Sequence, residues 1–173
     1  MIIGIPTLET DRLILRAPSL DDFEAEAGFF ASPRSAGVGG TQTRDQVWRY
    51  LAFHIGHWAF RGYGMFAIVE KSSGIYCGRS GPYFPEGWPE PEIGWTVMQA
   101  AEGRGIAFEA ATRTRQYAYD TLGWDTAISL IAASNQRSQT LAKRLDATLE
   151  SSYVHPQFGD MQVWRHPAAG VLQ

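Results

Sequence analysis

The chain has 173 residues, which fits one domain over residues 1–173 and leaves no room for two ordinary ones. Hydrophobic residues make up 45% and charged residues 19%, which excludes a natively disordered chain. The net charge is −3 and no basic run occurs, so we expect no nucleic-acid binding. Thirteen of the fifteen cations are arginines, which are good bidentate donors to phosphate, so a small phosphate-bearing ligand stays compatible with the sequence.

The cysteine count and the apolar segments of the sequence indicate the cellular compartment. Cys77 is the single cysteine, so no internal disulfide can form and a reducing cytoplasm fits best. The N-terminal segment 1–6 has no basic region and breaks at Pro6, and no apolar run approaches the length of a membrane span. We therefore expect a soluble intracellular protein without a membrane partner.

The first half of the chain predicts a strand, two helices and a hairpin. A strand over 11–16 precedes a helix over 20–30 that Ser19 caps. The glycine-rich stretch 36–40 is expected to be a mobile loop. Apolar residues at helical spacing predict a helix over 43–61 that ends at Gly62, followed by strands over 65–69 and 76–81.

The second half alternates strands and helices. A Pro- and Trp-rich connection over 82–91 leads to a strand over 92–98. A helix with a stripe of small residues then runs from about 105 to Gly123, and an apolar, β-branched run over 126–132 predicts a central strand. A helix over 135–145 and strands over 148–154 and 160–166 close the chain. This order predicts an α+β fold with a mixed sheet, parallel between 92–98 and 126–132 and antiparallel in the hairpins.

Gly103-Arg104-Gly105 lies between a predicted strand and the longest predicted helix. Three Gly-x-Gly triplets occur in the chain, but only this one stands between a strand and a long helix. Free backbone N–H groups and the helix dipole would suit a pyrophosphate there, and Arg104 would add a mobile cation. The alternative is a glycine turn that lets Ala107 approach the sheet.

Asn135 and Ser138 begin the next helix and share one of its faces. Both this motif and the glycine loop follow the ends of strands predicted to be parallel, where ligands gather in such sheets. We therefore expect one shared site. The alternative for these two residues is a helix cap and a satisfied backbone group.

Three segments carry a specific resemblance: Glu92-Ile93-Gly94-Trp95, then Glu102 to Ala110, then Asn135-x-x-Ser138-x-x-Leu141. They resemble the GCN5-related N-acetyltransferases (GNAT), in particular the RimJ/RimL-type branch that acetylates amines. The segment 10–16 resembles the first strand of that branch, so the match extends from about residue 8 to 166. The resemblance implies a GNAT-like fold: a mostly antiparallel sheet of six or seven strands, a central parallel pair splayed apart, and helices on both faces.

The resemblance also implies acetyl-CoA as co-substrate. The loop from Gly103 through Arg104, Gly105 and Ile106 to Ala107 would hold the pyrophosphate with its amides. Trp95, Thr96 and Val97 would pair through their backbone with pantetheine, and Asn135 would orient its amide. Glu102 stands where the family usually has Gln or Arg, and Asp146 where a glycine is usual, which should alter the turn after Leu145.

Acetyl transfer to an amine needs a neutral nucleophile, a polarised thioester and a hydrogen-bond donor for the departing thiolate. Ser138 is the candidate to donate a hydrogen bond to the sulfur, and Glu92 is the candidate to accept the amine proton. Glu90 is the alternative base. Glu92 could instead be an exposed carboxylate at the end of a strand, without a catalytic role. Backbone N–H groups could polarise the thioester carbonyl. Trp88 and Trp95 could line the acceptor pocket.

Several alternatives remain open at the level of sequence. One is a non-catalytic acyl-CoA- or nucleotide-binding module. A Rossmann-type dinucleotide binder has less support, because no acidic residue ends a strand about twenty residues after the glycines. His54 and His57 lack an acidic or cysteine partner at metal-ligand spacing, so we expect no metal. The amine could be a peptide N-terminus, a polyamine, an aminoglycoside or an amino acid, selected by the segments 31–43 and 82–91, and an exposed edge at the C-terminal strands could support a homodimer.

Overall fold

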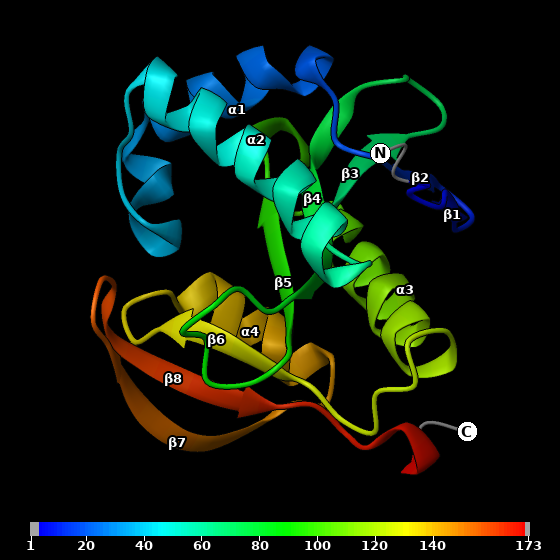
Figure 1. The fold of residues 1–173 in the computed structure, drawn as a ribbon, viewed down its shortest axis with the longest axis vertical. Helices are drawn as coiled ribbons and strands as arrows, with labels where there is room; N and C mark the ends of the chain where they lie inside the picture. Colours follow the sequence, from blue (N-terminus) through cyan, green and yellow to red (C-terminus); the bar gives the residue numbers. More distant parts are fainter. Residues whose placement is uncertain (1–3, 172–173) are drawn as a thin grey trace.

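A single sheet organises the molecule. The computed structural model describes residues 4–171, and these form an eight-stranded sheet in the order β1-β2-β3-β4-β5-β6-β8-β7. Every neighbouring pair is antiparallel except β5 and β6, which are parallel (Figure 1). The strands are β1 Leu8–Glu9, β2 Leu13–Arg16, β3 Phe66–Glu70, β4 Tyr76–Tyr83, β5 Glu92–Val97, β6 Ile128–Ala132, β7 Thr148–His155 and β8 Gly159–Arg165. The predicted mixed α+β fold is confirmed, and the strand beyond the expected six or seven is the two-residue β1, too short to show a periodic pattern.

Four α-helices and four short 3₁₀ helices surround this sheet in the described residues. The α-helices are α1 Phe23–Phe30, α2 Arg44–Arg61, α3 Ile106–Asp120 and α4 Gln136–Arg144. The 3₁₀ helices are η1 Leu20–Asp22, η2 Pro33–Val38, η3 Gln99–Ala101 and η4 Ala169–Val171. Within the described residues no helix is long and apolar enough to cross a membrane. Residues 1–3 of the N-terminal segment lie outside the described residues.

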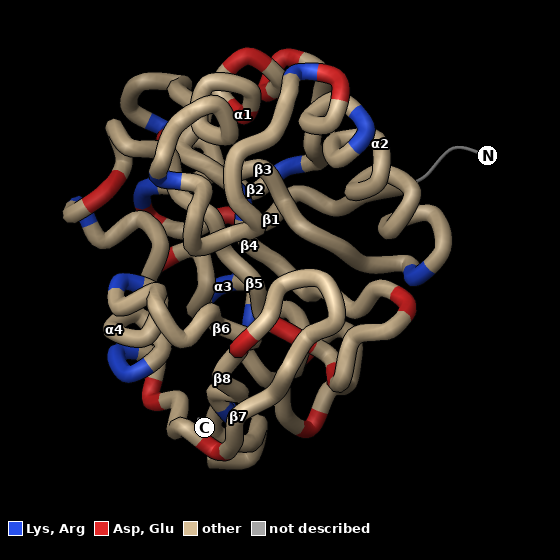
Figure 2. Tube along the Cα trace, turned by 90° about the vertical axis from the view of Figure 1, so that its left-hand side faces the viewer, with Lys and Arg blue, Asp and Glu red and all other residues tan. Residues whose placement is uncertain are grey.

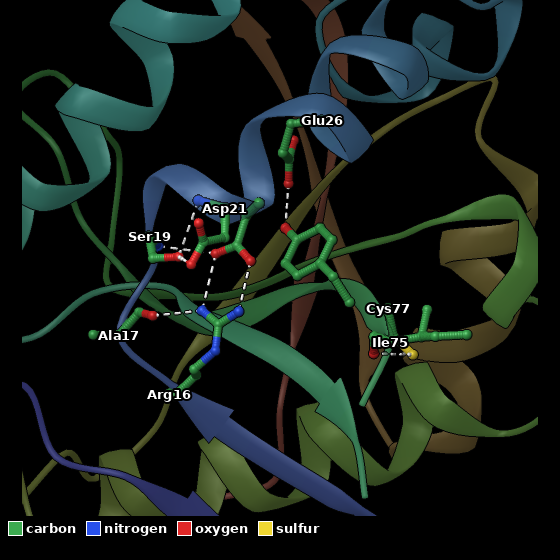
Figure 3. A network of polar contacts seen from close by, with 9 residues as sticks. Arg16, Ala17, Ser19, Asp21, Glu26, Ile75 and Cys77 are labelled. Carbon is green, nitrogen blue, oxygen red and sulfur yellow. Dashed lines mark hydrogen bonds and ion pairs between the residues drawn. The ribbon is translucent and has the colours of Figure 1, made fainter. Parts of the chain in front are cut away.

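Two adjacent residues of β4 show that helices cover both faces. Arg79 forms an ion pair with Glu26 of α1, whereas the hydroxyl of Ser80 lies 3.1 Å from that of Thr114 on α3. Because successive side chains of a strand point to opposite faces, α1 and α3 lie on opposite sides of the sheet. Figure 3 shows Glu26 projecting from α1 toward the hydroxyl of Tyr76 on β4. In the same view Arg16 of β2 donates to the carbonyl of Ala17 and to the carboxylate of Asp22 in η1.

Local capping explains where the first two helical segments begin. Ser19 is the N-cap, as predicted; it also closes a capping box with Asp22, and a 3₁₀ turn precedes α1. Thr43 caps α2, and Gly62 ends that helix in the left-handed conformation, φ 75°. The expectation of a loop over 36–40 is wrong in part, because residues 36–38 belong to η2, which the side chain of Asn135 holds through the Gly37 carbonyl at 3.2 Å.

The predicted small-residue stripe of α3 packs against the sheet. Ala110, Ala111 and Ala118 are fully buried, so the helix backbone can approach the strands closely. Asp146, after α4, adopts φ 60°, a conformation that glycine reaches without strain. The aspartate therefore adopts, in the turn after Leu145, a backbone conformation that favours glycine.

The parallel strands β5 and β6 separate after their first residues, and Figure 1 shows them diverging. Their register contains one pair, Glu92 with Ile128. Beyond it the hydroxyl of Ser129 donates to the carbonyl of Ile93 at 2.7 Å, a side-chain bond where a ladder bond would otherwise stand. The resulting gap positions the site.

Candidate active site

Two cavities meet at the gap between β5 and β6. One, of about 410 Å³, lies on the α1 and α2 side, and the other, of about 530 Å³, lies between α3, α4 and η2. Both are lined by the same five residues: Val38, Trp95, Thr96, Asn135 and Ser138. Two ligands bound in these cavities would therefore touch each other in the gap.

The glycine loop forms one wall of the larger cavity. Gly103 and Gly105 have φ of 70° and 78°, so the turn requires glycine, and α3 begins at the next residue, Ile106. The first amide N–H groups of a helix lack acceptors within it, and those of Ile106 and Ala107 stand at this wall. Because the side chain of Ile106 is buried in the core, the loop offers its backbone to a ligand.

Arg104 behaves differently from the expectation of a mobile phosphate cation. Its guanidinium pairs with Glu70 of β3, and its carbonyl accepts a bond from Arg12 at 2.9 Å. The side chain is thus tied to the last residue of β3, and Arg104 is absent from the lining of the larger cavity.

Other arginines supply positive charge to the larger cavity. Arg34 of η2 and Arg137 and Arg144 of α4 line it. Figure 2 shows basic positions along α4. Glu102, at the entrance to the glycine loop, forms ion pairs with Arg34 and, at 2.9 Å, with Arg137. A carboxylate therefore links η2 to α4 across the mouth of the cavity.

The three predicted residues of β5 alternate across the strand. Thr96 is buried and lines both cavities, Trp95 does so from the opposite face, and Val97 lines only the larger cavity. Since β6 has separated by this point, no parallel ladder is registered here beyond Glu92. Backbone groups of β5 are therefore open to an extended ligand in the gap.

Asn135 and Ser138 meet at the start of α4. The side-chain oxygen of Asn135 accepts from the Ser138 amide at 3.1 Å and its Nδ2 donates to Gly37, so Asn135 caps α4 and anchors η2. The hydroxyl of Ser138 accepts from the indole Nε1 of Trp95 at 3.1 Å. This bond fixes the hydroxyl oxygen, while its hydrogen stays free to donate toward the gap.

Glu92 is a buried carboxylate in the wall of the smaller cavity. Its oxygens accept from the indole Nε1 of Trp88 at 2.5 Å and from the Leu130 amide at 3.3 Å, and no cation pairs with it among the described residues. Burial raises the pKa of Glu92 to about 7, because removal from water disfavours the charged form more than these two bonds favour it. Such a carboxyl can exchange a proton at neutral pH.

Glu90, the alternative candidate, is engaged elsewhere. Both of its oxygens accept from Arg165, at 2.7 and 2.8 Å. Bonds to this guanidinium lower the pKa of Glu90. A carboxylate so held is a weak base and lies outside the lining of both cavities.

Comparison with known proteins identifies the family. A family model described as an acetyltransferase (GNAT) domain matches residues 12–148. The chain belongs to the GNAT acetyltransferases. It is similar to an acetyltransferase from Agrobacterium tumefaciens str. C58, with 35% identity and a TM-score of 0.87 over 96% of this chain and 97% of that one.

More distant GNAT structures share the fold. A putative GNAT-family acetyltransferase from Bordetella pertussis has 29% identity and a TM-score of 0.76, covering 94% of this chain and 99% of that one. RimL, a ribosomal L7/L12 α-N-protein acetyltransferase, was solved in complex with coenzyme A. It has a TM-score of 0.74 at 15% identity, covering 93% of this chain and 97% of that one. The resemblance drawn from the sequence is thereby confirmed for the family, and GNAT proteins use acetyl-CoA as co-substrate.

The two histidines of α2, His54 and His57, pack inside the protein, away from the candidate site. His57 donates from Nδ1 to the Tyr63 carbonyl at 2.9 Å and accepts the Phe84 amide on Nε2 at 3.0 Å. His54 is wholly buried, and that burial holds its pKa well below the usual value. Within residues 4–171 no group of three or more His, Cys, Asp or Glu side chains could hold a metal ion.

Some residues of this GNAT site could not be singled out from the sequence. Arg137 and Arg144 are seven apart, hence on one face of α4, a spacing that could have suggested an anion-binding helix. Arg34, Arg79 and Phe158 give no such signal, because only the tertiary fold brings η2, β4 and the β7–β8 turn to the gap.

Proposed function

We propose that this protein transfers the acetyl group of acetyl-CoA to a primary amine by direct attack of the amine on the thioester. The larger cavity would take coenzyme A, and the smaller one the amine. The observation that carries the proposal is the buried, cation-free carboxylate of Glu92 in the wall of the smaller cavity.

The cofactor would be bound largely by main-chain groups. The diphosphate would accept from the amides opening α3, while Arg34, Arg137 and Arg144 would supply charge. The pantetheine arm would pair with the open backbone of Trp95, Thr96 and Val97 in the gap. These residues fit the group, since cationic side chains and free amides line a cavity of about 530 Å³.

The chemical step would then use Glu92 and Ser138. The amine nitrogen forms a bond to the thioester carbon while its excess proton passes to the Glu92 carboxylate, directly or through water. The carbon–sulfur bond breaks, the thiolate leaves toward the hydroxyl of Ser138, and a proton from solvent completes the thiol. Products are the N-acetyl amine and free coenzyme A.

The decisive experiment replaces Glu92 by Gln and measures both catalysis and cofactor binding. We expect acetylation to fall about 100-fold or more, while the Kd for acetyl-CoA by calorimetry stays within about two-fold of wild type. Glu90→Gln is the matched control, two residues away with the same charge change, and should retain its turnover. Unchanged turnover in Glu92→Gln would remove Glu92 from the mechanism, and acetyl-CoA binding with no transfer to any amine would favour the non-catalytic module.

A further inference from the structure

Two side chains bridge β5 and β6 where the backbone pairing of these strands ends. The Leu130 amide of β6 donates to the Glu92 carboxylate at 3.3 Å, and the Ser129 hydroxyl donates to the Ile93 carbonyl at 2.7 Å. Both bonds cross the gap beside the proposed base. The orientation of the Ser129 hydroxyl therefore helps to fix the separation of the strands next to Glu92.

Ser129 is held by a buried histidine that the proposed mechanism does not use. Nε2 of His166, the residue after β8, lies 2.9 Å from the Ser129 hydroxyl oxygen, and both residues are 1% exposed. The backbone of His166 is anchored twice, because its amide donates to the Ala127 carbonyl at 2.9 Å and its carbonyl accepts from the Thr126 hydroxyl at 3.2 Å. The imidazole therefore meets Ser129 from a fixed position.

Arg115 of α3 determines which nitrogen of the His166 ring carries the proton. Its Nη1 lies 3.2 Å from Nδ1 of His166 and donates to the Leu145 carbonyl at 2.6 Å. Because a guanidinium can only donate, Nδ1 must accept, and a neutral imidazole then carries its hydrogen on Nε2. Burial, together with nearby guanidinium charges, lowers the pKa of His166 to about 3, so the ring stays neutral. Nε2 is thus the donor to Ser129, whose own hydrogen goes to the Ile93 carbonyl.

Packing alone does not account for Arg115. The residue is 6% exposed, and among the described residues no carboxylate lies within ion-pair distance of it. Burial accordingly lowers the pKa of Arg115. A buried cation without a counter-ion is destabilising, and an apolar side chain of similar length would fill the same space without that cost. The bonds of Arg115 to the Leu145 carbonyl and to His166 are what the arginine adds.

The same imidazole also meets the support of Ser138. The rings of His166 and Trp95 lie edge to face, with their centroids 6.5 Å apart. The Trp95 indole in turn donates to the Ser138 hydroxyl at 3.1 Å. One buried ring thus connects to the immediate neighbours of both groups that are proposed to act in the reaction.

We propose that His166, oriented by Arg115, is a positioning residue that holds the β5–β6 gap at the width that acetyl transfer requires. It acts through Ser129 and Trp95, because it lines neither cavity. This inference rests on the proposed function and adds a residue to it. Rates are sensitive to such placement, since a shift of about 1 Å in a reacting group can cost about 100-fold.

The first test determines the tautomer of His166 without any substrate. In protein labelled uniformly with ¹⁵N, long-range ¹H–¹⁵N correlation spectra should show a neutral ring protonated on Nε2, unchanged from pH 5 to pH 8. Its signals are assigned by their loss in His166→Gln. A ring protonated on Nδ1, or one that titrates in this range, would overturn the hydrogen-bond chain from Arg115 to Ser129.

Two substitutions of His166 then test the effect on catalysis. In His166→Gln the side-chain amide can donate from the place of Nε2, whereas in the matched control His166→Asn the shorter amide stays near Arg115 and cannot reach Ser129. We expect kcat within about threefold of wild type for the Gln variant and a fall of about tenfold or more for the Asn variant. The Kd for acetyl-CoA by calorimetry should stay within about threefold in both, because the diphosphate amides lie at the start of α3, away from Arg115.

The assay measures release of the coenzyme A thiol with spermidine, kanamycin, L-phenylalanine and tetraalanine, and the variants are compared on the amine that wild type acetylates fastest. Ser129→Ala should lose about as much kcat as His166→Asn, and the double variant should lose little more, because both act through one bond. Wild-type kcat in His166→Asn, or equal losses in the Gln and Asn variants, would overturn the positioning role.

The remaining outcomes are also decisive. If His166→Asn fails to fold, Ser129→Ala decides, and wild-type kcat in that variant would contradict the proposal. If wild type binds acetyl-CoA but acetylates none of the four amines, the proposed function falls, while the tautomer of His166 still tests the hydrogen-bond chain.

Discussion

The carboxylate of Glu92 accepts a hydrogen bond from the Leu130 amide across the gap between β5 and β6. In an unbroken parallel sheet that amide would donate to a β5 carbonyl. The separation of the strands thus both opens the gap and frees a backbone donor that holds the proposed base. The same separation exposes β5 backbone to a ligand.

The pH dependence of catalysis should report Glu92. Its pKa is about 7, so kcat/KM should rise with pH through that value as the carboxylate forms. The acceptor amine also loses its proton as pH rises, and the variant Glu92→Gln separates the two effects. In that variant the limb near pH 7 should disappear while the amine limb at higher pH remains; a limb near pH 7 that persists would assign it to another group.

Glu92 should also affect stability in a pH-dependent way. Its folded pKa, about 7, lies above the ordinary 4.5, so the folded protein holds the proton more tightly. The resulting stabilisation of the folded state, about 3 kcal/mol in all, is fully present below pH 4.5 and is lost as the pH rises through 7. The Tm of Glu92→Gln minus that of wild type, measured by calorimetry, should therefore increase from pH 5 to pH 8. A difference in Tm that stays constant over this range would show that the burial of Glu92 does not disfavour its charge.

Ser138 should act on the departing sulfur rather than on cofactor binding. Ser138→Ala should lower kcat about 10- to 100-fold, because the developing thiolate loses a hydrogen bond, with the Kd for acetyl-CoA nearly unchanged. Ser138→Thr keeps a hydroxyl and should recover part of the loss. Equal kcat in the Ala variant and wild type would mean that Ser138 only accepts the hydrogen bond from Trp95 and does not act on the sulfur.

We predict that the Glu102 side chain weakens cofactor binding. Its carboxylate forms ion pairs with two arginines at the mouth of the cavity and would repel a diphosphate. Glu102→Gln frees Arg34 and Arg137 and should lower the Kd for acetyl-CoA about three- to ten-fold at low salt, with a smaller gain at high salt. Glu24→Gln removes the same charge from an exposed pair with Arg44 and should leave the Kd unchanged. Weaker binding in Glu102→Gln would mean that Glu102 positions the arginines for the phosphates.

Two glycines should respond to alanine in opposite directions. Gly78 has φ 133°, and a Cβ there would stand 2.1 Å from the Thr96 carbonyl oxygen, so Gly78→Ala should cost about 3 kcal/mol or more. Gly28 lies exposed within α1 with open space around it, and Gly28→Ala should add about 0.5–1 kcal/mol. Urea unfolding of both variants measures the contrast, and destabilisation by Gly28→Ala would contradict this assignment.

The sequence predicted the main elements because their signals are local. The small-residue stripe of α3, the cap at Ser19 and the glycine ending α2 each depend on neighbours along the chain. The 3₁₀ helix η2 was missed although Ser32 caps it and Pro33 opens it, because its glycines predict a loop and the Asn135 contact comes from about a hundred residues away. Arg104 was expected to face the cofactor because of its position in the loop, yet its guanidinium pairs with Glu70 at the end of β3, a pairing that only the fold creates.

The five residues common to both cavities have a kinetic consequence. Because donor and acceptor would meet directly in the gap, no side chain has to carry the acetyl group between them. Cys77, the lone thiol, is buried in the core, and burial raises its pKa, which leaves it a poor nucleophile. Initial-rate plots against both substrates should therefore intersect, as in a sequential ternary-complex scheme, and parallel lines would require an acetylated protein.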